Sequence, residues 1–225
     1  MSAVVTGRHL EERTAPGLHD FLAREVLSRY APGARVVDLG AGSGALARRL
    51  ADMGAEVTAC DQAPVRAGPG VRFVPLDLDR PAFSEVVGRR VWDLVVAVEV
   101  IEHLEAPLAF LREVAALLAP REVAVITTPN LDSLPARGRF ALKGSLRQFD
   151  RWGDPTHISP IFWPLLQERY LPQAGLSVAE HLFYPPLGFV VGRPLYQRAL
   201  RPWGRLLAAA GLAGDVHVLV LEPRR

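Results

Sequence analysis

Cysteine is almost absent from this sequence, which has one such residue, Cys60, among 225. A lone cysteine excludes a disulfide framework and a zinc site built from four cysteines, so nothing here requires an oxidising compartment. The first residues, MSAVVTGRHLEERTAPG, lack the apolar core of a secretory signal, and no run reaches the roughly 18 apolar residues of a membrane span. We therefore expect a soluble, cytoplasmic protein with Cys60 in its core.

Lysine is also nearly absent, since Lys143 is the only one and arginine supplies the rest of the 26 basic residues. The charge is unevenly distributed: residues 1–130 hold 14 basic against 17 acidic residues, and residues 131–225 hold 12 against 7. An acidic partner of the second part would explain this excess, but a genome rich in arginine codons would produce it too. The charge alone therefore identifies no partner.

The apolar content is high enough for a buried core, because 49% of the residues are hydrophobic and 22% are charged. Short β-rich runs alternate with helix-like stretches, and several runs are apolar at successive positions, as in strands covered by helices on both faces. We predict a doubly wound α/β fold with a mostly parallel, seven-stranded sheet and an antiparallel final strand. The seven runs are 35–40, 56–61, 71–77, 92–98, 122–129, 176–184 and 215–223.

Helices are predicted between these runs and before the first of them. An amphipathic helix over 16–30 follows Pro16 and ends before Pro32-Gly33, and further helices are expected at 45–54, 108–120 and 161–175. Residues 131–160 have no clear period and form a partly ordered insertion. Residues 185–214 form a helical lid divided at Pro202, with Leu195, Ala199, Leu200, Trp203, Leu206 and Leu207 on one face and Arg198, Arg201 and Arg205 opposite. We expect residues 1–225 to be one domain carrying these two insertions.

The segment VVDLGAGSGALARRL, residues 36–50, has glycines at alternate positions: Gly40, Gly42 and Gly44. An apolar strand runs into this turn and a helix follows it, so the backbone can approach a ligand closely and the helix N-terminus favours an anionic group. Gly40, Gly42 and Ala45 also satisfy the dinucleotide fingerprint G-x-G-x-x-G/A. The glycines alone therefore leave two classes of cofactor open.

Asp38 completes the pattern D-x-G-x-G-x-G, which resembles the cofactor motif of class I S-adenosylmethionine-dependent methyltransferases. The resemblance implies a Rossmann-like fold, S-adenosylmethionine as cofactor and S-adenosylhomocysteine as product. It implies that Asp61, at the end of the second strand, binds both ribose hydroxyls through charge-assisted hydrogen bonds. Asp77 would contact the adenine amino group, and Leu78 would offer its backbone amide. The implied cofactor-binding residues are Asp38, Gly40, Ala41, Gly42, Gly44, Asp61, Gln62, Asp77, Leu78, Val98 and Glu99.

Two later segments narrow the resemblance. WDLVVAVEVIEHLEAP is similar to the fourth-strand motif of small-molecule methyltransferases, which implies that Val98 and Glu99 lie near the methionine part of the cofactor. VITTPN, followed by Asp154, Thr156 and His157 in a D-x-T-H pattern, resembles the branch that methylates sugars, quinones or phenols and similar metabolites. The implied acceptor is a small-molecule hydroxyl, with a nitrogen acceptor as the less favoured alternative.

Histidine is the side chain that best suits the proton chemistry of such a transfer. Positioning supplies much of the rate of an in-line methyl displacement, but a hydroxyl acceptor must also lose its proton. We assign this step to His157, with Asp154 as its orienting carboxylate, and keep His103 as the second candidate; each histidine has a structural alternative. The other expectations are that His181 and His217 are structural, that His9 and His19 are solvated, and that no metal is bound.

Other functions stay open at this point. A nicotinamide-dependent oxidoreductase would share the glycine turn, and a nonenzymatic S-adenosylmethionine-binding module would share the whole cofactor motif. RNA is a disfavoured partner and DNA is not expected, because no nucleic-acid-binding module accompanies the domain. The basic residues of 193–207 are interpreted as a solvated face, with weak contact to a membrane or a lipid-linked substrate as the less favoured alternative. The sequence predicts no oligomeric state.

Overall fold

The computed structural model describes residues 10–190 and 200–224. Its strands are β1 (Arg35–Leu39), β2 (Glu56–Asp61), β3 (Val71–Pro75), β4 (Trp92–Val98), β5 (Leu118–Pro129), β6 (Leu176–Tyr184) and β7 (Val216–Pro223). Its α-helices are α1 (Leu18–Phe21), α2 (Ala45–Asp52), α3 (Phe83–Val87), α4 (Pro107–Leu117), α5 (Leu134–Lys143), α6 (Trp163–Leu165), α7 (Leu171–Ala174) and α9 (Gly204–Ala209). Shorter helical turns are η1 (Leu22–Val26), η2 (Leu27–Arg29), η3 (Ile101–His103), η4 (Leu166–Tyr170) and η5 (Arg201–Trp203).

One seven-stranded sheet has the order β3-β2-β1-β4-β5-β7-β6. Strands β1 to β5 pair in parallel, and β7 is antiparallel to both of its neighbours, β5 and β6. The predicted doubly wound, mostly parallel sheet with an antiparallel final strand is therefore confirmed. The strand order reverses between β1 and β4, and ligands of such sheets bind where the strands end beside this reversal.

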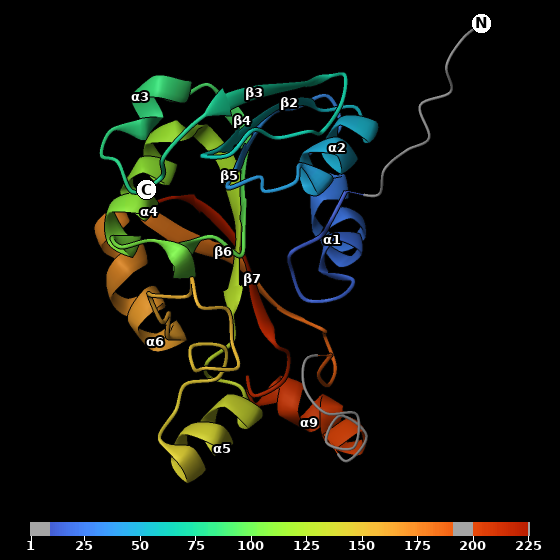
Figure 1. The fold of residues 1–225 in the computed structure, drawn as a ribbon, viewed down its shortest axis with the longest axis vertical. Coiled ribbons are helices and arrows are strands. Elements are labelled where there is room, and N and C mark those ends of the chain that lie inside the picture. The colour runs from blue at the N-terminus through green and yellow to red at the C-terminus, as the bar shows by residue number, and fades with distance from the viewer. Residues whose placement is uncertain (1–9, 191–199, 225) are drawn as a thin grey trace, which may run out of the picture.

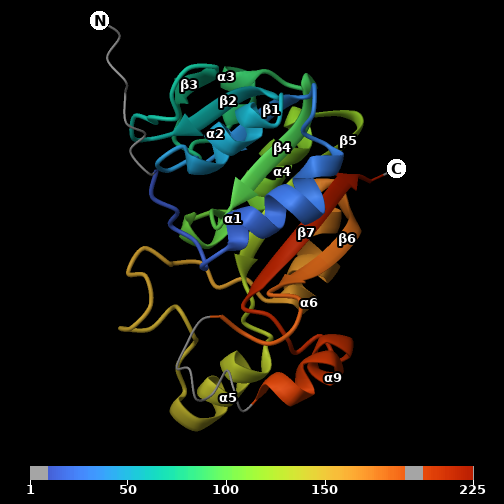
Figure 2. The ribbon, with the colours of Figure 1, turned by 90° about the vertical axis from the view of Figure 1, so that its right-hand side faces the viewer.

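Helices cover both faces of the sheet (Figures 1 and 2). On one face, the segment α1–η2 and helix α2 bury Leu22 and Leu50 against Val57 and Val96 of the sheet. On the other face, a larger core forms under α3, α4 and the helical segment α6–α7. Burial on both faces explains why β1 and β4 are apolar at successive positions. Cys60 is fully buried in β2, as predicted, and burial raises the pKa of its thiol to about 12.

Most predicted helices are present, and their ends differ by a few residues. The N-terminal helix, predicted over 16–30, spans 18–29 as one α, one π and one 3₁₀ segment. The predicted helix 108–120 is wrong at its end, because α4 stops at Leu117 and β5 begins at Leu118. Pro120 lies in that strand at a break in the β4–β5 register, where the missing N–H of proline costs no ladder hydrogen bond.

The two insertions contain more order than the sequence indicates, and they lie at one end of the molecule (Figures 1 and 2). Residues 131–160 include α5, and 204–209 form α9 after the turn η5 that contains Pro202. Of the predicted lid, residues 191–199 lie outside the described part. Trp203 and Leu206 of the expected apolar face are exposed, whereas Gly204 and Leu207 of α9 are buried and Ala208 packs against the small core that contains Phe189. Among the described helices, none has the length and apolar character needed to cross a membrane.

Candidate active site

The glycine turn after β1 has the backbone conformation that the motif predicts. Gly40, Gly42 and Gly44 have φ values of 70°, 55° and 86°, a region that side chains rarely allow. A Cβ on Gly40 would lie 2.6 Å from a Val100 methyl carbon, and one on Gly44 would lie 2.6 Å from a Val65 methyl carbon. Glycine is therefore required both by conformation and by space. Helix α2 starts directly after this turn, so its free N–H groups lie at the same edge of the sheet.

Asp61, at the end of β2, is hydrogen-bonded to the glycine turn that follows β1. Its Oδ2 accepts a hydrogen bond from the Gly42 N–H at 2.8 Å, and its Oδ1 accepts one from the Ala63 N–H at 2.9 Å. These two backbone donors hold the carboxylate in one orientation and leave its remaining lone pairs available to a ligand. The side chain is half-buried, as expected for a group that contacts a bound molecule.

A cleft of about 460 Å³ opens beside the glycine turn and Asp61. The predicted site residues that line it are Asp38, Gly40, Ala41, Gly42, Asp61, Gln62, Leu78, Val98, Glu99, His103 and Asp154. Three predicted residues do not line it, namely Gly44, Asp77 and His157. The Asp77 carboxylate lies beside the cleft and accepts a hydrogen bond from the Gln62 side chain at 3.1 Å. The structure thus brings most of the predicted cofactor residues into one site.

The N-terminal segment also lines this cleft, which the sequence did not indicate. Glu11, Arg13 and Thr14 face it, and the Ser43 hydroxyl donates a 2.6 Å hydrogen bond to the Glu11 carbonyl. The prediction that His19 is solvated is wrong. His19 is buried and lines the cleft, and burial lowers the pKa of its imidazole. No motif could have identified these residues, because the segment before α1 has no periodic pattern. His9 lies outside the described residues.

Two carboxyl groups, of buried Asp38 and half-buried Glu99, give the cleft an unusual electrostatic character. Asp38 is 2% exposed and its Oδ2 has no hydrogen-bond partner among the described residues. Burial, with the nearby charge of Asp61, raises the pKa of Asp38 to about 7. Burial likewise raises the pKa of Glu99 to about 7, against the opposing hydrogen bond from the Thr127 hydroxyl. Glu99 also has a backbone φ of 55°, which is rare for a residue other than glycine. A positively charged ligand group would be stabilised beside these two acids.

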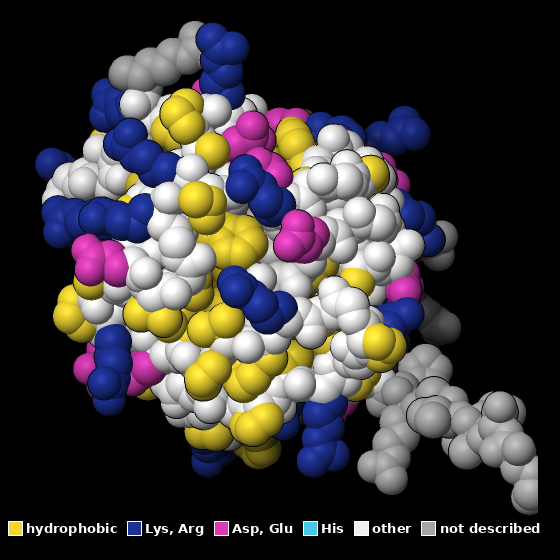
Figure 3. Space-filling model, turned by 90° about the horizontal axis from the view of Figure 1, so that it is seen from above, with side chains coloured by type: hydrophobic (Ala, Val, Ile, Leu, Met, Phe, Trp, Pro, Cys, Tyr) yellow, Lys and Arg dark blue, Asp and Glu magenta, His cyan; other side chains and the backbone are white. Residues whose placement is uncertain are grey.

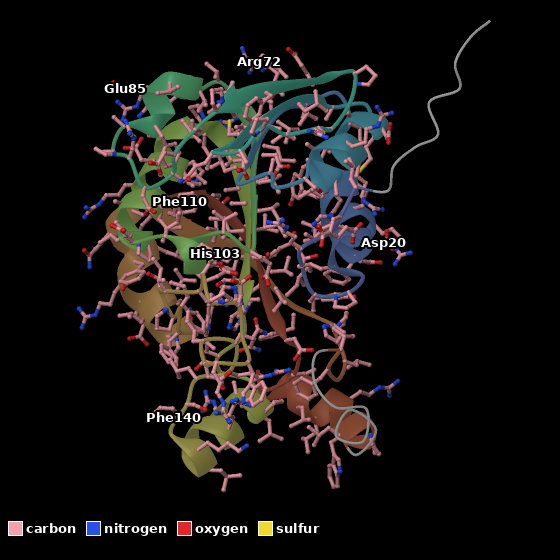
Figure 4. The ribbon with its side chains drawn as sticks, in the orientation of Figure 1. Asp20, Arg72, Glu85, His103, Phe110 and Phe140 are labelled. Carbon is pink, nitrogen blue, oxygen red and sulfur yellow. The ribbon has the colours of Figure 1, made fainter. Side chains whose placement is uncertain are left out.

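His103 lies on the turn η3, between β4 and α4, and faces the cleft (Figure 4). Its Nδ1 lies 2.9 Å from the Thr156 hydroxyl oxygen and 3.2 Å from the Thr156 carbonyl oxygen. The hydroxyl donates its own hydrogen to the Asp154 carboxylate at 2.5 Å, and a carbonyl oxygen can only accept. Nδ1 must therefore carry the proton in the neutral ring, which leaves Nε2 as the basic nitrogen.

Asp154 is thus linked through Thr156 to His103. The Asp154 carboxylate also accepts the Thr156 N–H at 2.8 Å, and its hydrogen bonds with Thr156 hold the pKa of Asp154 below its usual value. The loop itself is fixed to η3, since the N–H groups of Ile158 and Ser159 both donate to the Glu102 carbonyl. The chain Asp154–Thr156–His103 has the arrangement of an orienting acid and a base.

His157 lies behind His103 instead of facing the cleft. Its ring meets the His103 ring edge-on, with centroids 4.6 Å apart, and its Nδ1 lies 3.1 Å from the Gln148 carbonyl oxygen. Burial and the neighbouring His103 lower the pKa of His157. The side chains of Glu102, His103 and His157 bring ligand-type atoms within 4.8 Å of one another. Glu102 is a poor metal ligand here, because it is fully buried and burial raises its pKa well above the usual value.

Comparisons with known proteins place this geometry in context. A family model described as a methyltransferase domain matches residues 7–181. A ubiquinone biosynthesis O-methyltransferase of Xanthomonas campestris pv. campestris (strain B100) is 34% identical over 121 residues, covering 51% of this chain and 50% of that protein. A protein of the same description from Rhodopseudomonas palustris (strain HaA2) is 33% identical over 171 residues, covering 69% of this chain and 64% of that protein. This chain thus spans about half the length of the first of these relatives.

Solved structures show the same fold at low sequence identity. The 1,6-didemethyltoxoflavin-N1-methyltransferase of Burkholderia thailandensis, solved with bound 1,6-didemethyltoxoflavin and S-adenosylhomocysteine, superposes with a TM-score of 0.59. The two chains are 16% identical, and the match covers 92% of this chain and 78% of the other. At that identity, the match supports the fold alone.

Proposed function

This chain belongs to the methyltransferase domain family, and from that premise we propose that it transfers a methyl group from S-adenosylmethionine to a hydroxyl group of a small molecule. The observation that carries the proposal is the cleft in which the glycine turn, Asp61 and buried Asp38, whose Oδ2 has no hydrogen-bond partner among the described residues, come together. When bound, S-adenosylmethionine supplies an electrophilic methyl group on a positively charged sulfur. The residues around the cleft fit the parts of that molecule.

The polar groups of the cleft match the cofactor in order along the sheet edge. We propose that Asp61 accepts hydrogen bonds from the ribose hydroxyls, since two backbone N–H groups already fix its carboxylate. Gln62, Asp77 and Leu78 would surround the adenine, with Asp77 on the rim of the cleft. The glycine turn with Ala41 would allow close approach of the cofactor to the backbone.

The positive charges of the cofactor would lie near Asp38, Val98 and Glu99. Asp38 is buried, Glu99 is half-buried, and both line the cleft. A carboxylate withdrawn from water requires a partner charge or donor. The unpartnered Oδ2 of Asp38 supplies a site for the ammonium group, and Glu99 lies at the end of β4 beside it in the cleft. No residue of the chain needs to act as a covalent nucleophile, because the acceptor oxygen attacks the methyl carbon directly.

We propose that His103 is the general base that removes the acceptor proton. Thr156 holds the proton on Nδ1, so Nε2 is free to accept one, and Asp154 stabilises the charged ring through Thr156. This assignment exchanges the roles predicted for the two histidines. His157 becomes a neighbour that fixes the position of His103, with its Nδ1 held by the Gln148 carbonyl.

The acceptor class rests on the relatives, whose descriptions name an O-methyltransferase of ubiquinone biosynthesis. A phenol or hydroquinone is therefore the first acceptor to try, followed by sugars. The family assignment gives no support to the nicotinamide-dependent oxidoreductase. A cytoplasmic location and the absence of nucleic-acid partners stay predictions.

The test is formation of S-adenosylhomocysteine by the purified protein with a panel of phenols, hydroquinones and sugars. His103→Gln should lower turnover by about 10² to 10⁴-fold, the usual contribution of a general base. Thr156→Val should lower kcat about fivefold to tenfold with little change in KM, and Thr156→Ser, which keeps the hydroxyl, should restore it. If cofactor binds but no acceptor is methylated, the nonenzymatic binding module would replace this proposal.

A further inference from the structure

One end of the molecule is formed by two helices that share little surface with the rest of the fold. The α5/α9 end consists of residues 134–153 and 203–212, and both ribbon views place it below the sheet (Figures 1 and 2). The Leu134 N–H donates a 3.0 Å hydrogen bond to the Leu212 carbonyl, which joins the start of α5 to the segment after α9. In α5, only Ala136 is buried, so most of the surface of this helix has no packing partner.

Large apolar side chains are exposed at this end. Leu142 is 86% exposed and Trp152 is 74% exposed, values that would be unfavourable on a surface that contacts only water. The exposed apolar side chains of the α5/α9 end are Leu134, Phe140, Leu142, Trp152, Trp203 and Leu206. Figure 4 labels Phe140 at this end, far from His103 in the middle of the molecule. This cluster is larger than the scattered exposed apolar residues that need no explanation.

Cations accompany these apolar side chains. Residues 133–149 contain four basic and no acidic residues, and residues 200–214 contain two arginines and no acidic residue. Within the described part of the chain, Lys143, Arg151 and Arg205 form no ion pair. The opposite end of the molecule, viewed in Figure 3, has Asp and Glu side chains interspersed with its Lys and Arg. The excess of positive charge is therefore a local property of the α5/α9 end.

A cleft of about 520 Å³ lies on this surface, lined by Arg139, Lys143, Arg151 and Trp152. Asp150 neutralises Arg139 through an ion pair, whereas the Arg151 guanidinium lies over the Trp152 ring, 4.7 Å from its centroid. Two further cations beside an exposed indole match the chemistry of a phosphodiester headgroup with apolar material next to it. Tryptophan and basic side chains also favour the boundary between lipid headgroups and acyl chains.

We propose that the α5/α9 end docks on an anionic lipid bilayer. The exposed apolar side chains would enter the headgroup boundary, and Lys143, Arg151 and Arg205 would lie among the lipid phosphates. The loop that carries Trp152 continues to Thr156 in the cofactor cleft, so docking would hold the cleft close to the lipid surface. The proposal does not rest on the proposed function, because binding is measured without any acceptor or turnover.

The test is co-sedimentation of the full chain with vesicles of two compositions. One is an equimolar mixture of phosphatidylglycerol and phosphatidylcholine, and the other is pure phosphatidylcholine. We expect binding to the first and not to the second, with loss of binding as salt is raised. Absence of binding to the phosphatidylglycerol vesicles at low salt would overturn the proposal.

Two sets of variants locate the binding surface. Replacing Lys143, Arg151 and Arg205 together by glutamine should weaken vesicle partitioning about 100-fold, because each basic residue near an anionic surface contributes about fivefold. The matched control replaces Arg24, Arg89 and Arg121, three exposed arginines outside this end, and should leave binding within about twofold of wild type. Equal loss in both triple variants would show that net charge alone is responsible and would overturn the assignment to this surface.

Apolar variants provide the second comparison. Leu142→Ser with Trp152→Ser should weaken partitioning at least tenfold, whereas Val86→Ser on α3, which is 66% exposed at the other end, should not. Thermal melting checks that each variant is folded. If the surface instead joins two copies of the chain, the apolar variant would convert a dimer to a monomer in size-exclusion chromatography while vesicle binding was absent throughout. Tight binding of RNA at moderate salt with none to vesicles would likewise overturn the proposal.

Discussion

Affinity for S-adenosylmethionine should increase as pH rises through the neutral range, because two acids of the cleft, Asp38 and Glu99, must ionise to hold a cation. Burial raises the pKa of Asp38 and that of Glu99 to about 7, so each is largely protonated at pH 6. A permanent positive charge on the cofactor sulfur stabilises the ionised form of both groups. Binding should therefore release protons, and it should be weaker wherever the free protein holds those protons.

The size of this effect follows from the fraction of each acid that is already ionised. With a pKa of about 7, that fraction rises about fivefold between pH 6 and pH 7, and apparent affinity rises by the same factor. If both acids contribute, the increase is about 30-fold. The increase in affinity should end near pH 8, because the α-amino group of the cofactor has a pKa just below about 8 and loses its positive charge above it.

The assay is isothermal titration with S-adenosylmethionine at pH 6, 6.5 and 7, in buffers that differ in ionisation enthalpy, so that released protons are counted directly. Asp38→Asn with Glu99→Gln should lower affinity at pH 7 and flatten the pH dependence. His103→Gln, which changes a cleft side chain but neither of the two acids, serves as the control and should keep most of the slope. A flat profile in the wild-type protein, or an unchanged slope in the double variant, would refute this account of the cleft.

Three further predictions concern other parts of the molecule. Asp61→Ala should weaken cofactor binding at least tenfold, since each charge-assisted hydrogen bond to a carboxylate contributes about 1.5 to 3 kcal/mol; unchanged affinity in a folded variant would remove Asp61 from the site. His157→Ala should reduce turnover less than His103→Gln and leave cofactor affinity unchanged, and the reverse ranking would return the role of base to His157. The Nε2 of His181 lies 2.9 Å from the Nδ1 of His217, and burial lowers the pKa values of these two rings to about 4 and about 3. Both rings stay neutral in the folded chain, whereas the same histidines take up protons in the unfolded chain below about pH 6.5. Their contribution to the free energy of unfolding is therefore fully present above that pH. It is lost as pH falls towards 4, by about 1.4 kcal/mol per pH unit for each ring. Urea unfolding at pH 6 and pH 5 should show a smaller loss in His181→Gln/His217→Gln than in wild type, and equal losses would contradict the assignment.

The sequence predicts those parts of the fold whose residues are buried on a regular pattern. Strands β1 and β4 are apolar at successive positions because helices cover both faces, and the glycine turn is fixed by local backbone requirements. Helix α5 has no such pattern, because Ala136 alone is buried and the other positions face away from the core. Helix α3 is also missed, since its five residues are too few to establish a helical period.

The sequence likewise predicts one part of the candidate site and misses another. The cofactor residues follow one another at the ends of β1, β2 and β4, so their convergence follows from parallel strand order. The link between His103 and Thr156 joins positions 53 residues apart, and only the folded chain shows which histidine the Asp154 carboxylate supports. Likewise, nothing in the sequence indicates that Glu11 and Arg13 fold back over the cleft.

The most direct test of the central claim is calorimetric titration of the purified protein with S-adenosylmethionine, S-adenosylhomocysteine and NADH. The cleft described above predicts micromolar binding of the first two compounds and none of the third. Binding of NADH alone would contradict the proposed role of the glycine turn and Asp61, and with it the assignment of this cleft to methyl transfer.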